Sequence, residues 1–330
     1  MTKSPSSKTL VVEGLETRFL TSTGPVAAVR DVSLQVGKGE IVGLVGESGS
    51  GKSVTGLSIM GLIDAPGEIF AGRALLNGED LFKATPKRLR QLRGDRIAMI
   101  FQDPMMTLNP VLRIDTQMIE AIRAHDPKIS RSDARARCRD ALAQVGIPAP
   151  DERLAAYPHQ FSGGMRQRVA IAIAMLNRPD IIIADEPTTA LDVTIQAQIL
   201  AEMQKLCRET GTALIWITHD LTVVAGLTDR VYVMYAGSVV EEGPVDPMLD
   251  APIHPYTDGL IRSIPSHNTP GQRLHQIQGM TPALDRMPQG CRFHPRCPRR
   301  TEACLGEIAL EPFGDARHAR CIHPLLEKRS

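Results

Sequence analysis

The sequence has no hydrophobic stretch long enough to cross a lipid bilayer. Its longest uninterrupted apolar run is 169–176, whereas a membrane-spanning helix needs about 18 apolar residues. The N-terminal segment 1–12 is polar and lacks the apolar centre of a secretory signal. We therefore expect a cytosolic protein rather than a secreted or membrane-spanning one.

The chain also has little net charge and few cysteines. Its 38 Lys and Arg against 37 Asp and Glu leave a charge of +1, so no global positive field is available to hold nucleic acid or an anionic membrane. Six cysteines in 330 residues do not form the disulfide framework of a secreted protein. Hydrophobic residues make up 42% and charged residues 23%, which is typical of a globular protein of about two domains.

Apolar runs alternate with segments of helical periodicity through most of the chain. Short β-branched runs predict buried strands, and charged and apolar residues at helical spacing predict helices. We expect strands at 41–45, 96–101, 181–184 and 213–218, helices at 53–62, 134–145 and 164–176, and a strand pair at 231–234 and 238–242. This alternation favours an α/β fold with a mainly parallel sheet covered on both faces.

Two segments depart from that pattern. The helix-rich stretch at about 104–163 is expected to be a helical insertion into the α/β core. Ten of the 24 prolines fall between Pro244 and Pro298, which excludes a long helix or a central strand there. We therefore predict a main domain at 1–245 and an irregular C-terminal extension at 246–330.

A glycine-rich loop joins the predicted strand at 41–45 to the predicted helix at 53–62. It has the sequence Gly46-Glu47-Ser48-Gly49-Ser50-Gly51-Lys52-Ser53, which fits G-x-x-x-x-G-K-[ST]. The glycines let successive backbone N–H groups turn inward, and the helix N-terminus adds positive potential, so the loop is suited to bind the phosphates of ATP. Lys52 is expected to reach the β- and γ-phosphates, and the Ser53 hydroxyl to ligate Mg²⁺.

Two carboxylates follow the predicted strand at 181–184. Because ligands bind at the carboxyl ends of the strands in open α/β sheets, Asp185 and Glu186 are expected to lie beside the phosphates. Asp185 is expected to hold the Mg²⁺ shell, usually through water. Glu186 points in a different direction and is placed to polarise an attacking water.

The sequence around these motifs resembles the ABC ATPases. Phe161-Ser162-Gly163-Gly164-Met165-Arg166-Gln167-Arg168 is similar to the family's signature, although Phe161 and Met165 replace the common Leu and Gln beside the Ser-Gly-Gly core. Gln102 matches the Q-loop, Asp192 ends the D-loop at 189–192, His219 matches the switch histidine, and Phe19 matches the aromatic residue that stacks on adenine.

This resemblance covers nearly the whole chain and implies a complete architecture. It implies a P-loop NTPase cassette with a RecA-like core, an N-terminal antiparallel β subdomain, an inserted α-helical subdomain and a small cysteine-containing C-terminal extension. It further implies that Glu186, His219 and Gln102 serve ATP hydrolysis, with Gln102 joining Ser53 and Asp185 at Mg²⁺.

The resemblance also implies that one chain cannot complete an ATP site. Ser162, Gly163 and Gly164 precede a predicted helix and so form a second anion-binding N-terminus. In the family this segment faces the γ-phosphate held by the partner subunit, and Asp192 lies at the dimer interface. Two ATP molecules are then enclosed between two subunits arranged head to tail.

Several stretches resemble the peptide/nickel importer branch, the dipeptide and oligopeptide permeases. They are 46–53, 101–110, 185–198, 254–257 and 263–265. The resemblance implies a peripheral protein on the cytoplasmic face of the bacterial inner membrane, importing di- or oligopeptides or related small solutes. Its implied partners are a second ATPase, often a non-identical paralogue, two transmembrane permease subunits and a periplasmic binding protein, with no nucleic acid.

Four cysteines lie in the last 40 residues: Cys291, Cys297, Cys304 and Cys321. Four thiolates can hold a [4Fe–4S] cluster or zinc, but the closer C-x2–4-C pairs typical of structural zinc are absent. Some members of the resembled branch carry an iron–sulfur cluster here, which favours a cluster that holds the extension together. A zinc site, with His294 or His323, and free thiols remain alternatives.

Two other functions are left open by the sequence. One is a soluble ABC ATPase that acts on nucleic acid or ribosomes, but such proteins usually carry two cassettes per chain, and this chain has one. The other is a redox-sensing iron–sulfur regulator that only binds nucleotide, and the presence of Glu186 and His219 argues against it.

Overall fold

The computed structural model describes residues 8–189, 191–265, 268, 271, 274–314 and 316–326. The chain divides into two compact units, one with residues 37–40 and 83–215 and the other with 10–36, 41–82 and 216–326. The boundary between them falls within β8 (Ala213–Thr218). In the described part of the chain, no helix is both long and apolar enough to span a membrane.

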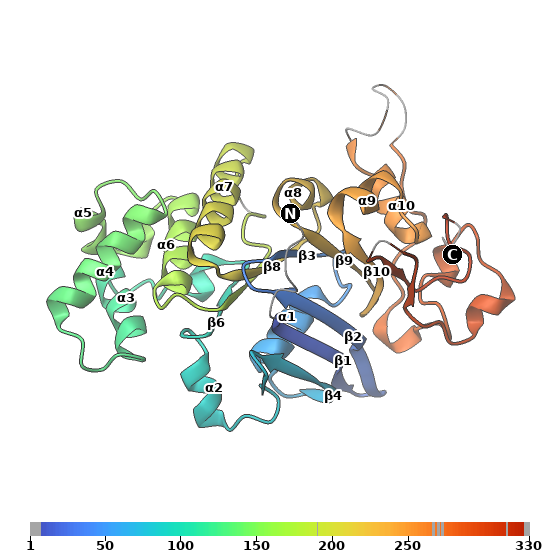
Figure 1. Ribbon diagram of the computed structural model, residues 1–330, viewed down its shortest axis with the longest axis horizontal. Helices are drawn as coiled ribbons and strands as arrows, with labels where there is room; N and C mark the ends of the chain where they lie inside the picture. The colour runs from blue at the N-terminus through green and yellow to red at the C-terminus, as the bar shows by residue number, and fades with distance from the viewer. Residues whose placement is uncertain are drawn as a thin grey trace. The chain divides into compact units, whose positions relative to one another are not determined.

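The unit that contains the glycine-rich loop begins with a four-stranded sheet in the order β2-β1-β4-β5 (Figure 1). Its strands are β1 (Lys8–Thr21), β2 (Gly24–Gly37), β4 (Gly67–Leu76) and β5 (Glu79–Asp80), and β4 runs antiparallel to both β1 and β5. This is the N-terminal antiparallel subdomain that the resemblance implied. The hydroxyls of Thr17 in β1 and Ser58 in α1 (Lys52–Met60) are hydrogen-bonded at 2.7 Å, which fixes α1 to this sheet.

The same unit contains a second set of strands, in the order β11-β12-β10-β9-β3. β3 (Ile41–Val45) is fully buried and runs parallel to β9 (Arg230–Tyr235), as expected for a central strand. β10 (Ser238–Pro244) is antiparallel to β9, which confirms the predicted strand pair. The short strands β11 and β12 and three helices complete this part: Glu311–Pro312, His318–Ala319, α8 (Leu221–Leu227), α9 (Val245–Asp250) and α10 (Pro255–Arg262).

The other unit combines two parallel strands with a group of helices. β6 (Ile97–Ile100) pairs in parallel with β7 (Ile181–Asp185), and all five residues of β7 are buried. The predicted insertion at about 104–163 is helical, and its helices lie together with α6 in Figure 1. The helices of this unit are α2 (Pro86–Leu92), α3 (Ile114–Arg123), α4 (Arg131–Gln144), α5 (Pro150–Leu154), α6 (Gly163–Met175) and α7 (Val193–Thr210).

The C-terminal extension follows β10, which ends at Pro244, and α9 begins at Val245. Beyond α10 its described residues form only short 3-10 turns and two-residue strands, as the prolines predicted. The turns are Leu284–Arg286, His294–Arg296 and Glu302–Leu305. The division into domains at residue 245 stays a prediction.

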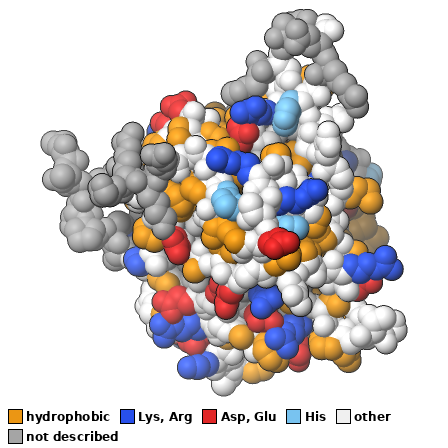
Figure 2. Space-filling model, turned by 90° about the vertical axis from the view of Figure 1, so that its right-hand side faces the viewer, with side chains coloured by type: hydrophobic (Ala, Val, Ile, Leu, Met, Phe, Trp, Pro, Cys, Tyr) orange, Lys and Arg blue, Asp and Glu red, His pale blue; other side chains and the backbone are white. Residues whose placement is uncertain are grey.

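The extension shares a hydrophobic core with the strands before it. Phe293 and Cys297 are buried in one cluster with Tyr235 of β9 and Tyr256 of α10, and the rings of Tyr235 and Phe293 meet edge to face at 5.2 Å. Figure 2 shows the face that carries the extension, where basic and acidic side chains are interspersed with hydrophobic ones. Apolar contacts therefore join the extension to β9.

Candidate nucleotide-binding site

Residues 46–53 form a closed loop between the buried strand β3 and the N-terminus of α1. Gly46, Gly49 and Gly51 have φ values of 156°, 76° and 97°, which side-chain-bearing residues rarely adopt. At Gly46 an added Cβ would lie 2.2 Å from the carbonyl oxygen of Met234 in β9. The predicted loop is present, and its first glycine is required by the close approach of β9.

The charged and polar groups of this loop are arranged to receive an anion. Lys52 is 4% exposed, and its Nζ donates hydrogen bonds to the carbonyl oxygens of Gly46 at 2.9 Å and Glu47 at 3.0 Å. The Oγ of Ser50 is buried and has no hydrogen-bond partner within the described residues. A buried hydroxyl without a partner costs stability unless a ligand pairs with it, so this residue fits a phosphate-binding loop.

Asp185 and Glu186 lie at the end of β7, in the other compact unit. Asp185 is 7% exposed, and Glu186 has a φ of 44°, a strained conformation for a residue with a side chain. The Oε2 atom of Glu186 accepts hydrogen bonds from Thr189 Oγ1 at 3.0 Å and from Gln102 Nε2 at 3.4 Å. The structure thus brings together two of the three predicted catalytic residues, Glu186 and Gln102.

The signature segment caps a helix that packs tightly on α7. Ser162 is the N-cap of α6, and its Oγ accepts a hydrogen bond from the backbone N–H of Met165 at 3.2 Å. An added Cβ at Gly164 would lie 2.8 Å from Cγ2 of Ile195, so a larger residue would push α7 away. Ser162 and Gly164 therefore have structural roles in their own unit, and the contact of Ser162, Gly163 and Gly164 with a partner's nucleotide stays a prediction.

Asp192 has a comparable structural role. Its Oδ1 accepts a hydrogen bond from the N–H of Ile195 at 2.9 Å and caps α7. Ala190, which belongs to the predicted D-loop, lies outside the described residues. The predicted role of Asp192 at a dimer interface is not tested by this arrangement.

Phe19 and His219 belong to the same unit as the phosphate loop. Phe19 in β1 is half-buried opposite Gly67 of β4, and an added Cβ at Gly67 would lie 2.7 Å from Cε1 of Phe19. His219 is exposed just after β8, next to Asp220, which caps α8. Their predicted contacts with adenine and with the γ-phosphate remain predictions.

Sequence reasoning missed the residue that fastens the signature helix. Arg168 in α6 is 9% exposed, and it donates to the carbonyl oxygen of Val145 and to Glu202 Oε1, both at 2.7 Å. Burial raises the pKa of Glu202, and the charge of Arg168 opposes that rise. The sequence shows the basic residues within 164–176, but it does not show which of them is buried.

The four cysteines of the extension are not in disulfides, and hydrogen bonds join some of the segments that carry them. The N–H of Cys291 donates to the carbonyl oxygen of Cys304 at 2.8 Å, and the N–H of Arg299 donates to Cys297 Sγ at 3.4 Å. Arg299 Nη1 donates to the carbonyl oxygen of Pro324 at 2.9 Å, close in sequence to Cys321. Across the described residues, however, no three His, Cys, Asp or Glu side chains are placed to hold a metal ion, so the cluster stays a prediction.

The other two cysteines behave as packing residues. Cys138 in α4 and Cys207 in α7 are both buried. Burial raises the pKa of each thiol to about 12, so neither is a reactive thiolate near neutral pH.

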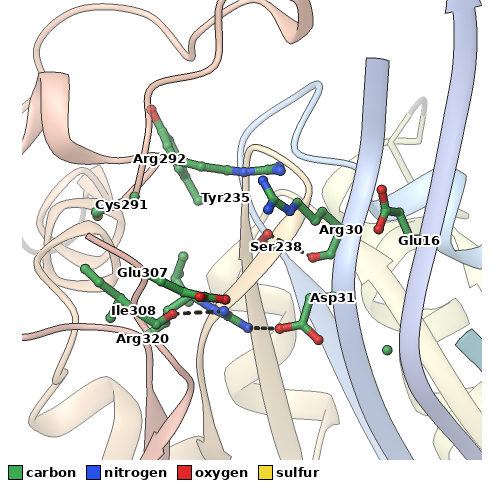
Figure 3. A pocket seen from close by; sticks show the side chains of 13 residues that line it. Glu16, Arg30, Asp31, Tyr235, Ser238, Cys291, Arg292, Glu307, Ile308 and Arg320 are labelled. Carbon is green, nitrogen blue, oxygen red and sulfur yellow. Dashed lines mark hydrogen bonds and ion pairs between the residues drawn. The ribbon is translucent and has the colours of Figure 1, made fainter. Parts of the chain in front are cut away.

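A polar cavity of about 480 Å³ lies between β2 and the extension (Figure 3). Cys291 is on its wall, and Arg320 Nη2 pairs with Asp31 Oδ2 at 2.9 Å across it. Its charged lining residues are Glu16, Arg30, Asp31, Arg292, Glu307 and Arg320. Acidic and basic groups balance, so the cavity favours a ligand of neither sign, and its ion pair ties the extension to β2.

Comparison with known proteins assigns both parts of the chain. Residues 29–189 match the ABC transporter family, and residues 240–304 match the C-terminal region of oligopeptide/dipeptide transporters. The chain is 48% identical to the dipeptide transport ATP-binding protein DppD of Escherichia coli over 96% of this chain and 97% of that protein. It is 45% identical to the oligopeptide transport ATP-binding protein OppD of Salmonella typhimurium over 98% and 96% of the two chains.

Solved structures show the same fold. The dimeric ATP-binding cassette MJ0796, described as a post-hydrolysis state bound to ADP and Pi, has a TM-score of 0.65 and 28% identity, covering 72% of this chain and 98% of that one. The cbiO1 protein of Clostridium perfringens has a TM-score of 0.63 and 27% identity, covering 74% and 92%. With these matches and the phosphate loop in place, the chain belongs to the ABC transporter family, among the ATP-binding subunits of the oligopeptide/dipeptide transporters.

Proposed function

We propose that this chain is one of two non-identical ATPase subunits that energise import of di- or oligopeptides from the cytoplasmic face of a bacterial inner membrane. As an ABC ATPase of the peptide-transporter type, it binds ATP with Mg²⁺ and hydrolyses it. The observation that carries the proposal is the phosphate loop, with Lys52 folded inside it and the buried Ser50 hydroxyl left for a ligand.

Different residues of this chain have different roles in ATP hydrolysis. Loop 46–53 binds the phosphates through backbone N–H groups, and Lys52 supplies a positive charge to the β- and γ-phosphates. Ser53, Gln102 and Asp185 would hold Mg²⁺, and the ion would supply positive charge to the transferred phosphoryl group. Glu186 orients and polarises the attacking water, and Gln102 and Thr189 hold its carboxylate.

A second subunit completes each site in this proposal. Ser162 to Gly164 offer the N-terminus of α6 to a phosphate on the partner, and His219 contacts the γ-phosphate of its own subunit. The dimer of the similar cassette MJ0796 supports this arrangement, because that protein is itself dimeric with bound nucleotide. ATP then holds the two subunits together, and hydrolysis releases them.

Exposed apolar residues after Gln102 suit contact with the permease subunits. Met105, Met106 and Val111 are 40%, 76% and 76% exposed and follow Gln102 closely in the chain. Large exposed apolar side chains that gather in one segment mark an interaction site more often than scattered ones do. We assign this segment, with the helical insertion, to the docking surface for the membrane subunits.

Affinity purification of the tagged chain from solubilised bacterial membranes tests the proposed assembly. We expect two permease subunits and a second, non-identical ATPase to copurify, and Met106→Asp to reduce permease recovery by at least about tenfold, because a carboxylate must be desolvated at an apolar contact. Met280→Asp, which changes a methionine 87% exposed on the extension, is the matched control and should leave recovery unchanged. Copurification of ribosomes or DNA instead, or of this chain alone, would overturn the assignment.

The four cysteines of the extension are the second part of the proposal. Burial raises the pKa of Cys291 and Cys297 and raises that of Cys321 to about 11, and the thiol of Cys304 adds to the rise at each of them. We propose that Cys291, Cys297, Cys304 and Cys321 hold a [4Fe–4S] cluster that fastens the extension, with zinc as the alternative occupant. The hydrogen bonds between their segments support a shared site.

Metal analysis of the anaerobically purified chain tests this proposal. We expect about four iron and four sulfide per chain with a broad visible absorbance, and loss of most of the iron in Cys297→Ser. Cys138→Ala removes a buried thiol in α4 and should leave the iron content unchanged. About one zinc per chain without sulfide would establish the alternative. A chain that contains no metal and no sulfide would refute a metal site.

A further inference from the structure

The phosphate-binding loop contains a single acidic residue, Glu47. A triphosphate carries several negative charges, and a carboxylate within a few ångströms of it opposes binding unless a cation neutralises it. The backbone carbonyl oxygen of Glu47 accepts a hydrogen bond from Lys52 Nζ at 3.0 Å, and the charge of Lys52 helps to lower the pKa of the Glu47 carboxyl. The loop therefore needs something that removes the effect of this charge.

Arg296 of the C-terminal extension makes a bidentate ion pair with Glu47. Its Nη1 lies 2.6 Å from Oε2 and its Nη2 lies 3.0 Å from Oε1 of the carboxylate. Thr281, also in the extension, donates its hydroxyl to Oε2 at 3.0 Å. Paired, parallel contacts between a guanidinium and a carboxylate are among the strongest and most directional hydrogen bonds in proteins.

The backbone of Glu47 is fixed from the same side. Its N–H donates to the hydroxyl of Tyr256 in α10 at 2.9 Å. Tyr256 is fully buried and packs against Tyr235 and Phe293 of the shared core. Arg296, Thr281 and Tyr256, all in the extension, thus hold one residue of the phosphate loop.

Arg296 itself is held rigidly. Its side chain is 5% exposed, and its Nε donates to the carbonyl oxygen of Gln278 at 2.9 Å. Its guanidinium also lies 5.7 Å from the ring centre of Tyr235. Burial alone would raise the pKa of Glu47, but the hydrogen bonds and charge of Arg296, with Thr281 and Lys52, hold the pKa below its usual range.

We propose that Arg296 is a positioning residue of the ATP site, which neutralises Glu47 and orients the phosphate loop from the C-terminal extension. This inference rests on the assignment of loop 46–53 to nucleotide. The extension is then a component of the ATPase site. Arg296 directly precedes Cys297, so this ion pair joins the phosphate loop to the cysteine-bearing segment.

The order of nucleotide affinities in a double-mutant cycle tests the proposal. Arg296→Gln leaves the Glu47 carboxylate uncompensated beside the phosphates, so we expect the Kd for Mg–ATP to rise at least about tenfold. Glu47→Gln alone removes the opposing charge and should bind at least as tightly as the parent chain. The double variant E47Q/R296Q should recover most of the loss, and salt should reduce the defect of R296Q.

A purely structural ion pair predicts a different order, in which the double variant binds no better than R296Q, and that result would overturn the inference. Arg296→Lys keeps the positive charge but loses the bidentate contact, so its Kd should lie between those of the parent and R296Q. This variant tests the proposal even if R296Q folds poorly. Parent-like affinity in both R296Q and R296K would also refute it.

Two controls distinguish a failure of the proposed role of Arg296 from a failure of the assignment of loop 46–53 to nucleotide. Asp31→Asn breaks a different ion pair between the extension and the body, the one with Arg320, and Asn tolerates the φ of 51° at this position. Its Kd should match the parent, which excludes general loosening of the extension as the cause. If the parent chain and Lys52→Ala bind nucleotide equally, the loop assignment itself fails, whatever R296Q does.

Discussion

Replacement of Glu186 by Gln is expected to lower kcat for ATP hydrolysis by at least about 100-fold while ATP binding is retained. Glutamine has the same shape and keeps a carbonyl oxygen able to accept from Thr189 and Gln102, so the end of β7 should keep its structure. The amide is neutral, however, and cannot polarise water as a carboxylate does. Steady-state hydrolysis and a nucleotide-binding titration on the same preparation measure both effects.

The same variant should also reveal the dimer. In the proposed assembly bound ATP holds the two subunits together and hydrolysis releases them. E186Q should therefore accumulate as a dimer with ATP when it is mixed with the proposed partner ATPase and analysed by size-exclusion chromatography. Glu209→Gln is the matched control, because Glu209 is exposed in the same unit and pairs only loosely with Lys205 at 3.9 Å. Hydrolysis by E186Q at the parent rate would refute the role of Glu186.

The parts of the fold that could be predicted are those with a strong local signal. The runs at 41–45 and 181–184 are apolar because the strands are buried on both faces, and they appear as β3 and β7. The helix expected at 53–62 is α1, which ends at Gly61 in a left-handed conformation. The loop between β3 and α1 could be recognised from its sequence because Gly46, Gly49 and Gly51 have positive φ values that residues with side chains rarely adopt.

The N-terminal sheet could not be predicted from periodicity alone. β1 should alternate between buried and exposed positions, but its register with β4 shifts between Glu13 and Thr17. A bulge of this kind moves later side chains to the other face, so the period-2 pattern is lost. Only the family resemblance, carried by distant motifs, indicated an antiparallel subdomain there.

The contact of the extension with the phosphate loop could not be predicted from the sequence. Glu47 occupies a position of the glycine-rich pattern where any residue is allowed, and Arg296 lies 249 positions later in a segment without periodicity. Nothing local marks one arginine of this segment as the partner. The pairing depends on how Phe293 and Tyr256 pack around β9, which is a tertiary property.

Gly46→Ala and Gly49→Ala form a matched pair that tests the loop geometry with one methyl group each. At Gly46 the added Cβ would lie 2.2 Å from the Met234 carbonyl oxygen and 2.7 Å from Ser50 Oγ, so the loop or β9 must move. At Gly49 nothing lies within 4 Å of the added Cβ, and only the left-handed φ of 76° opposes alanine.

We therefore expect very different costs from the two substitutions. Gly46→Ala should lower the free energy of unfolding by at least about 3 kcal/mol and abolish measurable ATP binding, because overpacking adds to backbone strain. Gly49→Ala should cost about 1 to 2 kcal/mol, the penalty for one residue in the left-handed region. Urea unfolding without nucleotide, followed by ATP titration, compares them. Equal losses in the free energy of unfolding would show that the close approach of β9 to the loop does not constrain Gly46. The conformation of the phosphate loop would then be determined by its own sequence rather than by the neighbouring strand.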